Sequence, residues 1–205
     1  MSPRSGGGSR GFTLVELLVA LLIGGVAIAA ELALFRLHGQ VARRTQAELT
    51  ANAGAAWALS IVGRDLELAG TDPARAGVVA LSQAGRDHLV LDQDYDGDGA
   101  IDASSAERVT ISWSPQGGGR LLRALGRQSM NIATEVPAAG FLVRYFDAAG
   151  AELPVPPAGE LDAASAAAVR RVALELVVIE RWGVSRSRVA LRGSAALRTR
   201  VRGPV

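Results

Sequence analysis

The sequence predicts an α+β fold in which one long N-terminal helix packs on an antiparallel β-sheet. From Phe12 to Gly70, small and apolar residues recur at helical spacing and no proline interrupts them. Beyond Pro73, short runs with β-type alternation are separated by turns that contain glycine or proline. A helix followed by a series of strands is the element order of an α+β domain.

Composition excludes several classes of function. The chain has 205 residues, of which 49% are hydrophobic, and a net charge of +2. Cysteine is absent and the histidines are His38 and His88, so disulfides and the common zinc sites are excluded. There is no basic patch with interleaved aromatic residues, so direct binding of nucleic acid is not expected. No motif places a nucleophile beside a base and an orienting acid, and the sequence therefore predicts no enzyme.

The first structural element follows a polar leader, residues 1–11, and is an apolar run from Phe12 to Ala30. At about 1.5 Å per residue, a helix over residues 12–35 is long enough to span a hydrocarbon core of about 30 Å. Its apolar run contains one strongly polar side chain, Glu16. A charge at the centre of a membrane helix costs about 3 kcal/mol to insert, so a sequence that keeps one usually has a use for it.

Residues 11–17, Gly-Phe-Thr-Leu-Val-Glu-Leu, resemble the prepilin signal of the type IV pilin family. The resemblance implies cleavage between Gly11 and Phe12 by a prepilin peptidase, followed by N-methylation of Phe12. It also implies that Glu16 faces the terminal amine of a neighbouring subunit in a helical fibre. Physical chemistry is consistent with this role, because a carboxylate in the first turn complements the positive end of the helix dipole. In a poorly solvated setting such a pair fixes the register between subunits more than it adds stability.

The same resemblance implies a location. It predicts a single-pass inner-membrane protein with a cytoplasmic N-terminus and a periplasmic C-terminal domain, later incorporated in a pilus or pseudopilus. Arg4 and Arg10 before the span favour this orientation. An ordinary secretory signal with a cleavage site near Ala27–Ala29 is the alternative, but it leaves Glu16 unexplained.

The second half of the helix, residues 36–70, is predicted to be amphipathic, which gives one helix of about 55 to 60 residues. Gly70 and the Thr-Asp-Pro sequence after it end the helix. Its last turns, residues 61–70 with the Arg64–Asp65 pair, resemble the helix end of PilW-type minor pilins. The remaining residues, 71–205, are predicted to form a β-rich globular domain.

The predicted strands differ in how clearly their sequences show β-type alternation. The clearest is 108–113, in which Val109, Ile111 and Trp113 share one face, followed by a turn at 115–119. The other predicted strands are 78–81, 88–91, 121–125, 141–146, 172–179 and an alternating region over 188–202. In this last region one face is apolar and the other is rich in arginine. The basic face is either a solvated surface that discourages edge pairing or a contact surface for an acidic patch of another subunit. Residues 153–159 read as an exposed loop, and the alanine-rich segment after them receives no assignment.

A second chemical feature is an aspartate- and glycine-rich stretch. Counting Asp94 as position 1 puts aspartates at positions 1, 3 and 5, glycine at 6 and aspartate at 9, a spacing that is similar to the first nine positions of an EF-hand calcium loop. The predicted ligands are Asp94, Asp96, Asp98, Asp102 and the backbone carbonyl of Ala100, with Asp92 and Glu107 as further candidates. The bidentate glutamate expected at position 12 is missing, because Ser105 stands there, and the flanks read as strands. We expect weak calcium binding with a structural role; the alternative is a hydrated hairpin loop.

The sequence therefore predicts a non-catalytic minor pilin that helps to start or assemble a type IV pilus. Its expected partners are other minor and major pilins, prepilin peptidase, the inner-membrane assembly machinery and membrane lipid. Two alternatives stay open. One is a J-type minor pseudopilin of a type II secretion system, and the other is a monomeric, membrane-anchored, calcium-dependent binding protein.

Overall fold

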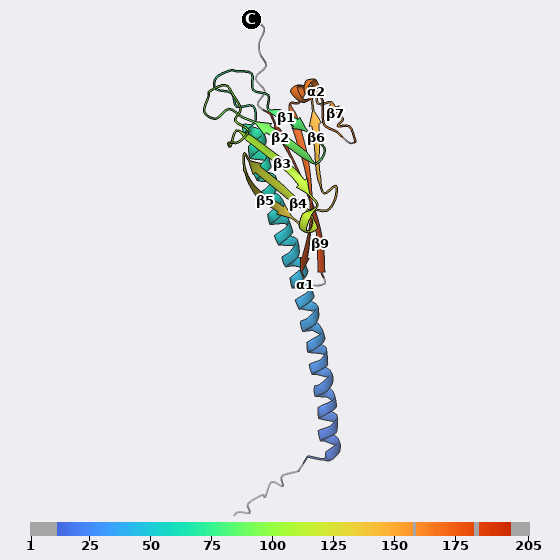
Figure 1. Cartoon of the computed structure of the whole chain (residues 1–205). Helices are drawn as coiled ribbons and strands as arrows, with labels where there is room; N and C mark the ends of the chain where they lie inside the picture. The colour runs from blue at the N-terminus through green and yellow to red at the C-terminus, as the bar shows by residue number, and fades with distance from the viewer. Residues whose placement is uncertain (1–11, 158, 183–184, 198–205) are drawn as a thin grey trace, which may run out of the picture. The chain divides into compact units, whose positions relative to one another are not determined.

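The computed structural model describes residues 12–157, 159–182 and 185–197 and groups the chain into two compact units, Met1–Arg43 and Arg44–Val205. Helix α1, Leu14–Leu68, contains 55 residues and passes from the first unit into the second (Figure 1). This length agrees with the predicted helix. Gly70 follows with a φ of 74°, in the left-handed region that commonly ends a helix.

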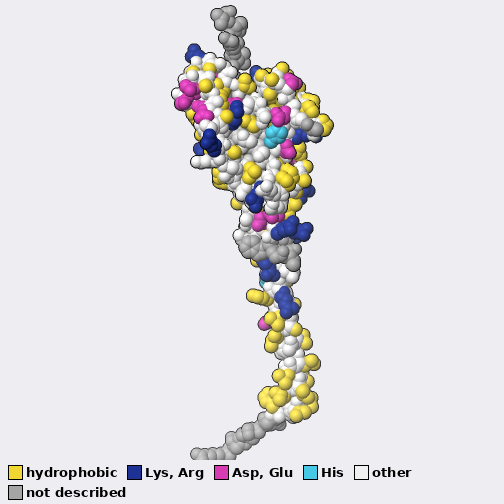
Figure 2. All heavy atoms as spheres, in the orientation of Figure 1, with side chains coloured by type: hydrophobic (Ala, Val, Ile, Leu, Met, Phe, Trp, Pro, Cys, Tyr) yellow, Lys and Arg dark blue, Asp and Glu magenta, His cyan; other side chains and the backbone are white. Residues whose placement is uncertain are grey.

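The first unit contains the apolar part of α1, from Leu14 to Ala30. Hydrophobic side chains cover this segment in Figure 2, and its leucine, isoleucine and valine residues are exposed. By length and composition this helix is able to cross a membrane. A helix that is apolar on all sides and not covered by protein is suited to contact with lipid or with other apolar helices.

The second half of α1 packs into the core of the second unit through small side chains. Its buried residues are spaced three or four apart, so they form one face of the helix. They are Ala47, Ala51, Ala55, Ala58, Val62, Asp65 and Leu66. Because most of these side chains are alanines, the helix backbone is able to approach the strands closely.

The strands form two antiparallel sheets. The first has the order β1-β2-β3-β4-β5, made of Leu81–Ala84, His88–Asp92, Arg108–Ser114, Arg120–Leu125 and Gln128–Thr134. The second has the order β7-β6-β8-β9, made of Glu152–Leu153, Phe141–Phe146, Arg171–Trp182 and Ser185–Ala196. Two short helices complete the fold, η1 at Gln116–Gly118 and α2 at Ala163–Ala168. The predicted α+β, pilin-like architecture of a long helix on antiparallel strands is confirmed.

The predicted exposed loop 153–159 is wrong in part, because Leu153 belongs to β7 and Val155 is buried in the core. Two other segments differ from the prediction for identifiable reasons. The first strand begins at Leu81 and not at Val78, because the Asp72 carboxylate accepts hydrogen bonds from the backbone N–H groups of Ala76, Gly77 and Val78 and holds them in a loop. Burial opposes the charge on Asp72, but these hydrogen bonds outweigh it and lower the pKa of the carboxyl group. Strand β5 was not predicted, since it lies at a sheet edge where Ile132 is its one buried residue and the apolar alternation is lost.

The last strand follows its predicted alternation. In β9 the odd-numbered residues face inward and the arginines at 186, 188 and 192 are exposed. The predicted continuation over 198–202 lies outside the described residues. Along the outer face, Arg192 of β9 pairs with Glu175 of β8 across a distance of 3.0 Å.

Candidate functional site

The N-terminus of α1 is capped by two side chains of the predicted processing motif. Thr13 precedes the first helical residue, and its backbone N–H and hydroxyl both donate to Oε2 of Glu16 at 2.9 Å. The Glu16 N–H in turn donates to the Thr13 hydroxyl oxygen at 3.2 Å. This reciprocal arrangement of Thr-x-x-Glu is a capping box, and it gives Glu16 a local role in starting the helix. The spacing was visible in the sequence, but the prediction did not use it.

Glu16 keeps a free oxygen. Both bonds from Thr13 end on Oε2, and within the described residues Oε1 accepts no hydrogen bond. Phe12, which is 85% exposed, stands four positions before Glu16 in the chain. Oε1 of Glu16 is therefore able to accept a hydrogen bond from a donor outside its own helix. Gly11 and the leader, residues 1–11, lie outside the described residues.

The far end of α1 is fixed by a buried ion pair. The guanidinium of Arg123 on β4 donates through two nitrogens to the two oxygens of Asp65, each at 2.7 Å. The Asp65 side chain is 5% exposed and that of Arg123 is 16% exposed. The hydrogen bond to Asp65 raises the pKa of Arg123, and burial opposes it. Asp65, which the sequence singled out only as part of a resemblance, thus joins the helix end to the first sheet.

The aspartate- and glycine-rich stretch forms the loop between β2 and β3. The loop is closed at its base by a backbone hydrogen bond from Gln93 to Glu107 at 2.9 Å. It is also tied to the end of α1, because the Gly70 N–H donates to the Asp92 carbonyl at 2.9 Å and the Asp94 N–H donates to the Thr71 carbonyl at 2.8 Å. In Figure 2 acidic side chains gather at the corner of the second unit where Figure 1 shows this loop.

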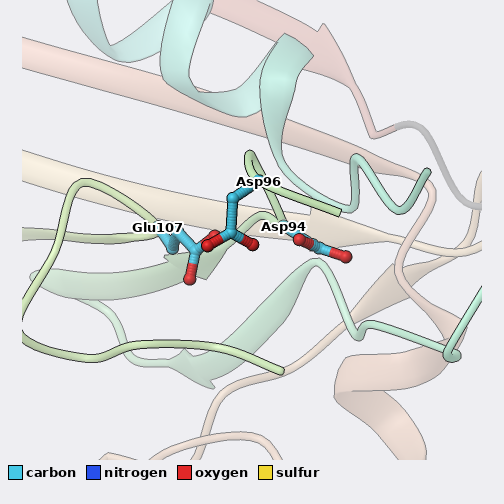
Figure 3. Close-up of side chains that lie close together, drawn as sticks. All are labelled: Asp94, Asp96 and Glu107. Carbon is cyan, nitrogen blue, oxygen red and sulfur yellow. The ribbon is translucent and has the colours of Figure 1, made fainter. Parts of the chain in front are cut away.

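Three carboxylates of this loop come together. One oxygen from each of Asp94, Asp96 and Glu107 lies within 4.8 Å of the other two (Figure 3). Asp94 and Glu107 are buried, and Asp96 is exposed. Oxygens that bind one calcium ion at about 2.4 Å stand at most about 5 Å apart, so this spacing matches a shared hard cation. Three acids at this distance repel one another when no cation is bound.

The same carboxylates also organise the loop backbone. Asp94 accepts from the N–H groups of Gly97 and Gly99 at 2.7 and 3.1 Å, and Glu107 accepts from those of Tyr95 and Asp102 at 3.0 and 2.8 Å. Gly97 and Gly99 have φ angles of 77° and 83°, which favour glycine and produce the sharp turn expected at the sixth position. The loop therefore presents Asp94 and Glu107 from fixed positions.

The other predicted ligands lie elsewhere in the loop. Asp92 makes a two-point ion pair with Arg108 at 2.7 and 2.8 Å, which raises the pKa of Arg108. Asp98 accepts from the N–H of Ala100, and Asp102 accepts from Ser104. The hydrogen bonds from Ser104 lower the pKa of Asp102. Asp98, Ala100 and Asp102 are exposed, and the carboxylates of Asp92, Asp98 and Asp102 do not belong to the group of three.

Comparison with protein families identifies the N-terminal segment. The family described as "Prokaryotic N-terminal methylation motif" matches residues 7–30. This segment carries the N-terminal methylation motif of a type IV pilin-like or pseudopilin-like prepilin. Comparison with curated proteins gives no significant match, and comparison with solved structures gives none either.

The pilin-type N-terminus agrees with the geometry around it. The matched residues contain the capping box and the apolar part of α1, and the motif implies processing by a prepilin peptidase and assembly with other pilus subunits. An apolar N-terminal helix is consistent with a prepilin anchored in the inner membrane. Pilin-like proteins are structural subunits without catalysis, in agreement with the prediction that this chain is not an enzyme.

Proposed function

We propose that this protein is a minor pilin of the PilW type, a structural subunit that helps to initiate or assemble a type IV pilus. The observation that carries the proposal is the continuity of the methylation motif with a 55-residue helix whose distal half is fixed in a β-rich unit. The buried Asp65–Arg123 pair supports the PilW assignment, because it gives a structural purpose to the helix end that resembles this subfamily.

The proposed mechanism is assembly through the first helix. Residues 12–35 hold the subunit in the bilayer, and cleavage after Gly11 frees the amine of Phe12. Oε1 of Glu16 then accepts a hydrogen bond from the Phe12 amine of a neighbouring subunit, while Oε2 keeps its hydrogen bonds to Thr13 in the helix cap. In a poorly solvated setting an uncompensated charge is strongly unfavourable, so the pair selects the register in which neighbouring helices associate.

The proposal is tested by deleting the gene and measuring sheared surface pili and secreted enzymes in the same strain. Loss of pili with normal secretion is the expected result. Loss of secretion with normal pili would replace the proposal by the minor-pseudopilin alternative. An intact mass of the membrane-extracted chain that still includes residues 1–11 would instead favour the monomeric membrane anchor.

We also propose that the group of Asp94, Asp96 and Glu107 binds calcium. The donors are all carboxylate oxygens, which suit a hard cation, and their spacing matches one shared ion. Because the loop is bonded to the backbone at Gly70 and Thr71, bound calcium would stabilise the end of α1 and the β2–β3 loop together. Such a role is structural and suits a chain without disulfides.

Calcium at about ten times its dissociation constant is expected to raise the melting temperature of the full chain in detergent micelles by about 3 to 6 °C. Asp96→Asn and Glu107→Gln are each expected to weaken calcium binding at least about tenfold, as measured by calorimetric titration. The matched control is Glu67→Gln, which removes one charge from an exposed position of α1. No binding at millimolar calcium, or equal weakening by the control, would contradict the site.

A further inference from the structure

A histidine side chain is held between two carboxylates on the second unit. Nδ1 of His88 lies 3.0 Å from Oδ1 of Asp87, and Nε2 lies 3.0 Å from Oε1 of Glu160. His88 is the one histidine of residues 44–205, and a histidine with acidic side chains around it is visible on this unit in Figure 2. In the sequence, His88 is the first residue of the predicted strand 88–91, and no motif indicates a partner for it.

The protonation state of the ring decides whether both contacts form. An ionised carboxylate only accepts hydrogen bonds, and a neutral imidazole has one N–H donor and one acceptor nitrogen. Both 3.0 Å contacts are hydrogen bonds to ionised carboxylates only when both ring nitrogens carry a proton. When the ring loses a proton, one nitrogen turns a lone pair towards a carboxylate, and that contact becomes repulsive.

The His88 ring packs directly against the backbone of Gly85. A Cβ atom placed on Gly85 would lie 2.2 Å from Cε1 of His88, so only glycine leaves room for the imidazole in this position. The turn beneath the ring is itself fixed, because the Gly85 N–H donates to the His88 carbonyl at 3.0 Å and the Tyr145 hydroxyl donates to the Gly85 carbonyl at 2.7 Å. When the ring loses a proton, the Glu160 side chain and its segment are therefore expected to move, and the His88 ring is not.

Glu160 belongs to the short segment 159–162, which leads into α2. This segment is held to the first sheet by the Leu161 N–H, which donates to the Ala84 carbonyl at 2.9 Å, and Asp162 caps α2. Among the described residues, the groups near the ring that carry or could carry charge, besides Asp87 and Glu160, are Arg86 and the buried Tyr145 hydroxyl. The Nε of Arg86 donates to the Val155 carbonyl. A pocket of about 500 Å³, lined by Arg86, Asp87, His88, Trp113 and Glu160 among others, gives water access to the ring.

We propose that His88 is a protonation-dependent clasp, which in its doubly protonated form joins the β1–β2 turn to the segment 159–162 and which releases Glu160 when the ring becomes neutral. The clasp lies in the second unit and is separate from the processing motif and from the calcium group. Its test is therefore independent of whether the chain assembles into a pilus.

The direction of the pH effect follows from the folded-state shift. Burial alone lowers the pKa of His88, but the hydrogen bonds and charges of Asp87 and Glu160 outweigh it, so the pKa lies above the ordinary value of 6.5. A group with a raised folded pKa stabilises the fold fully below its unfolded pKa and loses that contribution as the pH rises through the folded value. The clasp is thus fully closed below about pH 6.5 and opens as the pH rises through the raised folded pKa of His88.

The experiment uses the full chain in detergent micelles, purified without a histidine tag and carrying His38→Gln so that His88 is the single imidazole. Nitrogen-15 NMR of the ring is expected to show two protonated nitrogens at pH 6 and a titration midpoint above 6.5. Glu160→Gln is expected to lower that midpoint by about one pH unit, because it removes one of the two charges.

Amide hydrogen exchange supplies the structural readout. After correction for the intrinsic pH dependence of exchange, protection of Leu161 is expected to fall about two- to fivefold as the clasp opens, since the pair is partly exposed. In Glu160→Gln the same protection should not depend on pH. A midpoint at or below 6.5, or an unchanged pH dependence in Glu160→Gln, would overturn the proposal.

Discussion

Glu16→Gln is expected to give a subunit that is cleaved after Gly11 but enters fibres at less than about one tenth of the normal amount. Glutamine at this position keeps an oxygen that accepts from Thr13, so the capping box survives and the helix still starts at Leu14. The substitution removes only the charge that is proposed to pair with the Phe12 amine of a neighbour. Intact mass of the membrane-extracted chain measures cleavage, and immunodetection in the sheared fraction measures incorporation.

Thr13→Ala is the complementary variant, because it weakens the cap and keeps the charge. Loss of a cap costs about 1 kcal/mol, which shortens or frays the first turn but leaves an apolar helix in the bilayer. Thr13→Ala should therefore be incorporated, provided that its mass shows normal cleavage. If Glu16→Gln assembles normally and Thr13→Ala does not, Glu16 acts through the capping box and the proposed charge pair is wrong.

Asp65→Ala is expected to destabilise the second unit by about 3 to 5 kcal/mol. The substitution leaves the Arg123 guanidinium, 16% exposed, without its two-point partner in the core. It also leaves a cavity beside α1, where the packing depends on small side chains. The measurement is chemical denaturation of the full chain in micelles, with the dependence on denaturant compared between variants to confirm that the same unit unfolds.

Two further variants separate the buried charge from other effects. Glu175→Gln removes an exposed pair, in which Arg192 is 80% exposed, and should cost less than about 1 kcal/mol. The double variant Asp65→Leu with Arg123→Met replaces the pair by apolar side chains and should recover much of the loss. Equal destabilisation by Asp65→Ala and Glu175→Gln would show that the buried pair does not fix the helix end.

Local features were predictable from the sequence because the groups that cause them are neighbours in the chain. The extent of α1 follows from apolar spacing and from the glycine and proline at its end, and the structure places the helix at Leu14–Leu68. The capping box of Thr13 and Glu16 is equally local, since the two residues are three positions apart. The aspartate spacing likewise indicated a cation loop, and two of its members, Asp94 and Asp96, lie within reach of one ion.

Distant pairings were decided by the tertiary structure alone. The strand register pairs Asp92 with Arg108 and places Glu107 beside Asp94 and Asp96, which no spacing within the loop specifies. The Asp65–Arg123 pair joins residues 58 apart, and the His88–Glu160 contact joins residues 72 apart. Sequence alone determined the helix, its processing motif and the loop chemistry, since these depend on residues a few positions apart. The partners of Asp65, His88 and Glu107 depend on how two sheets and one helix pack, and that is a property of the whole fold.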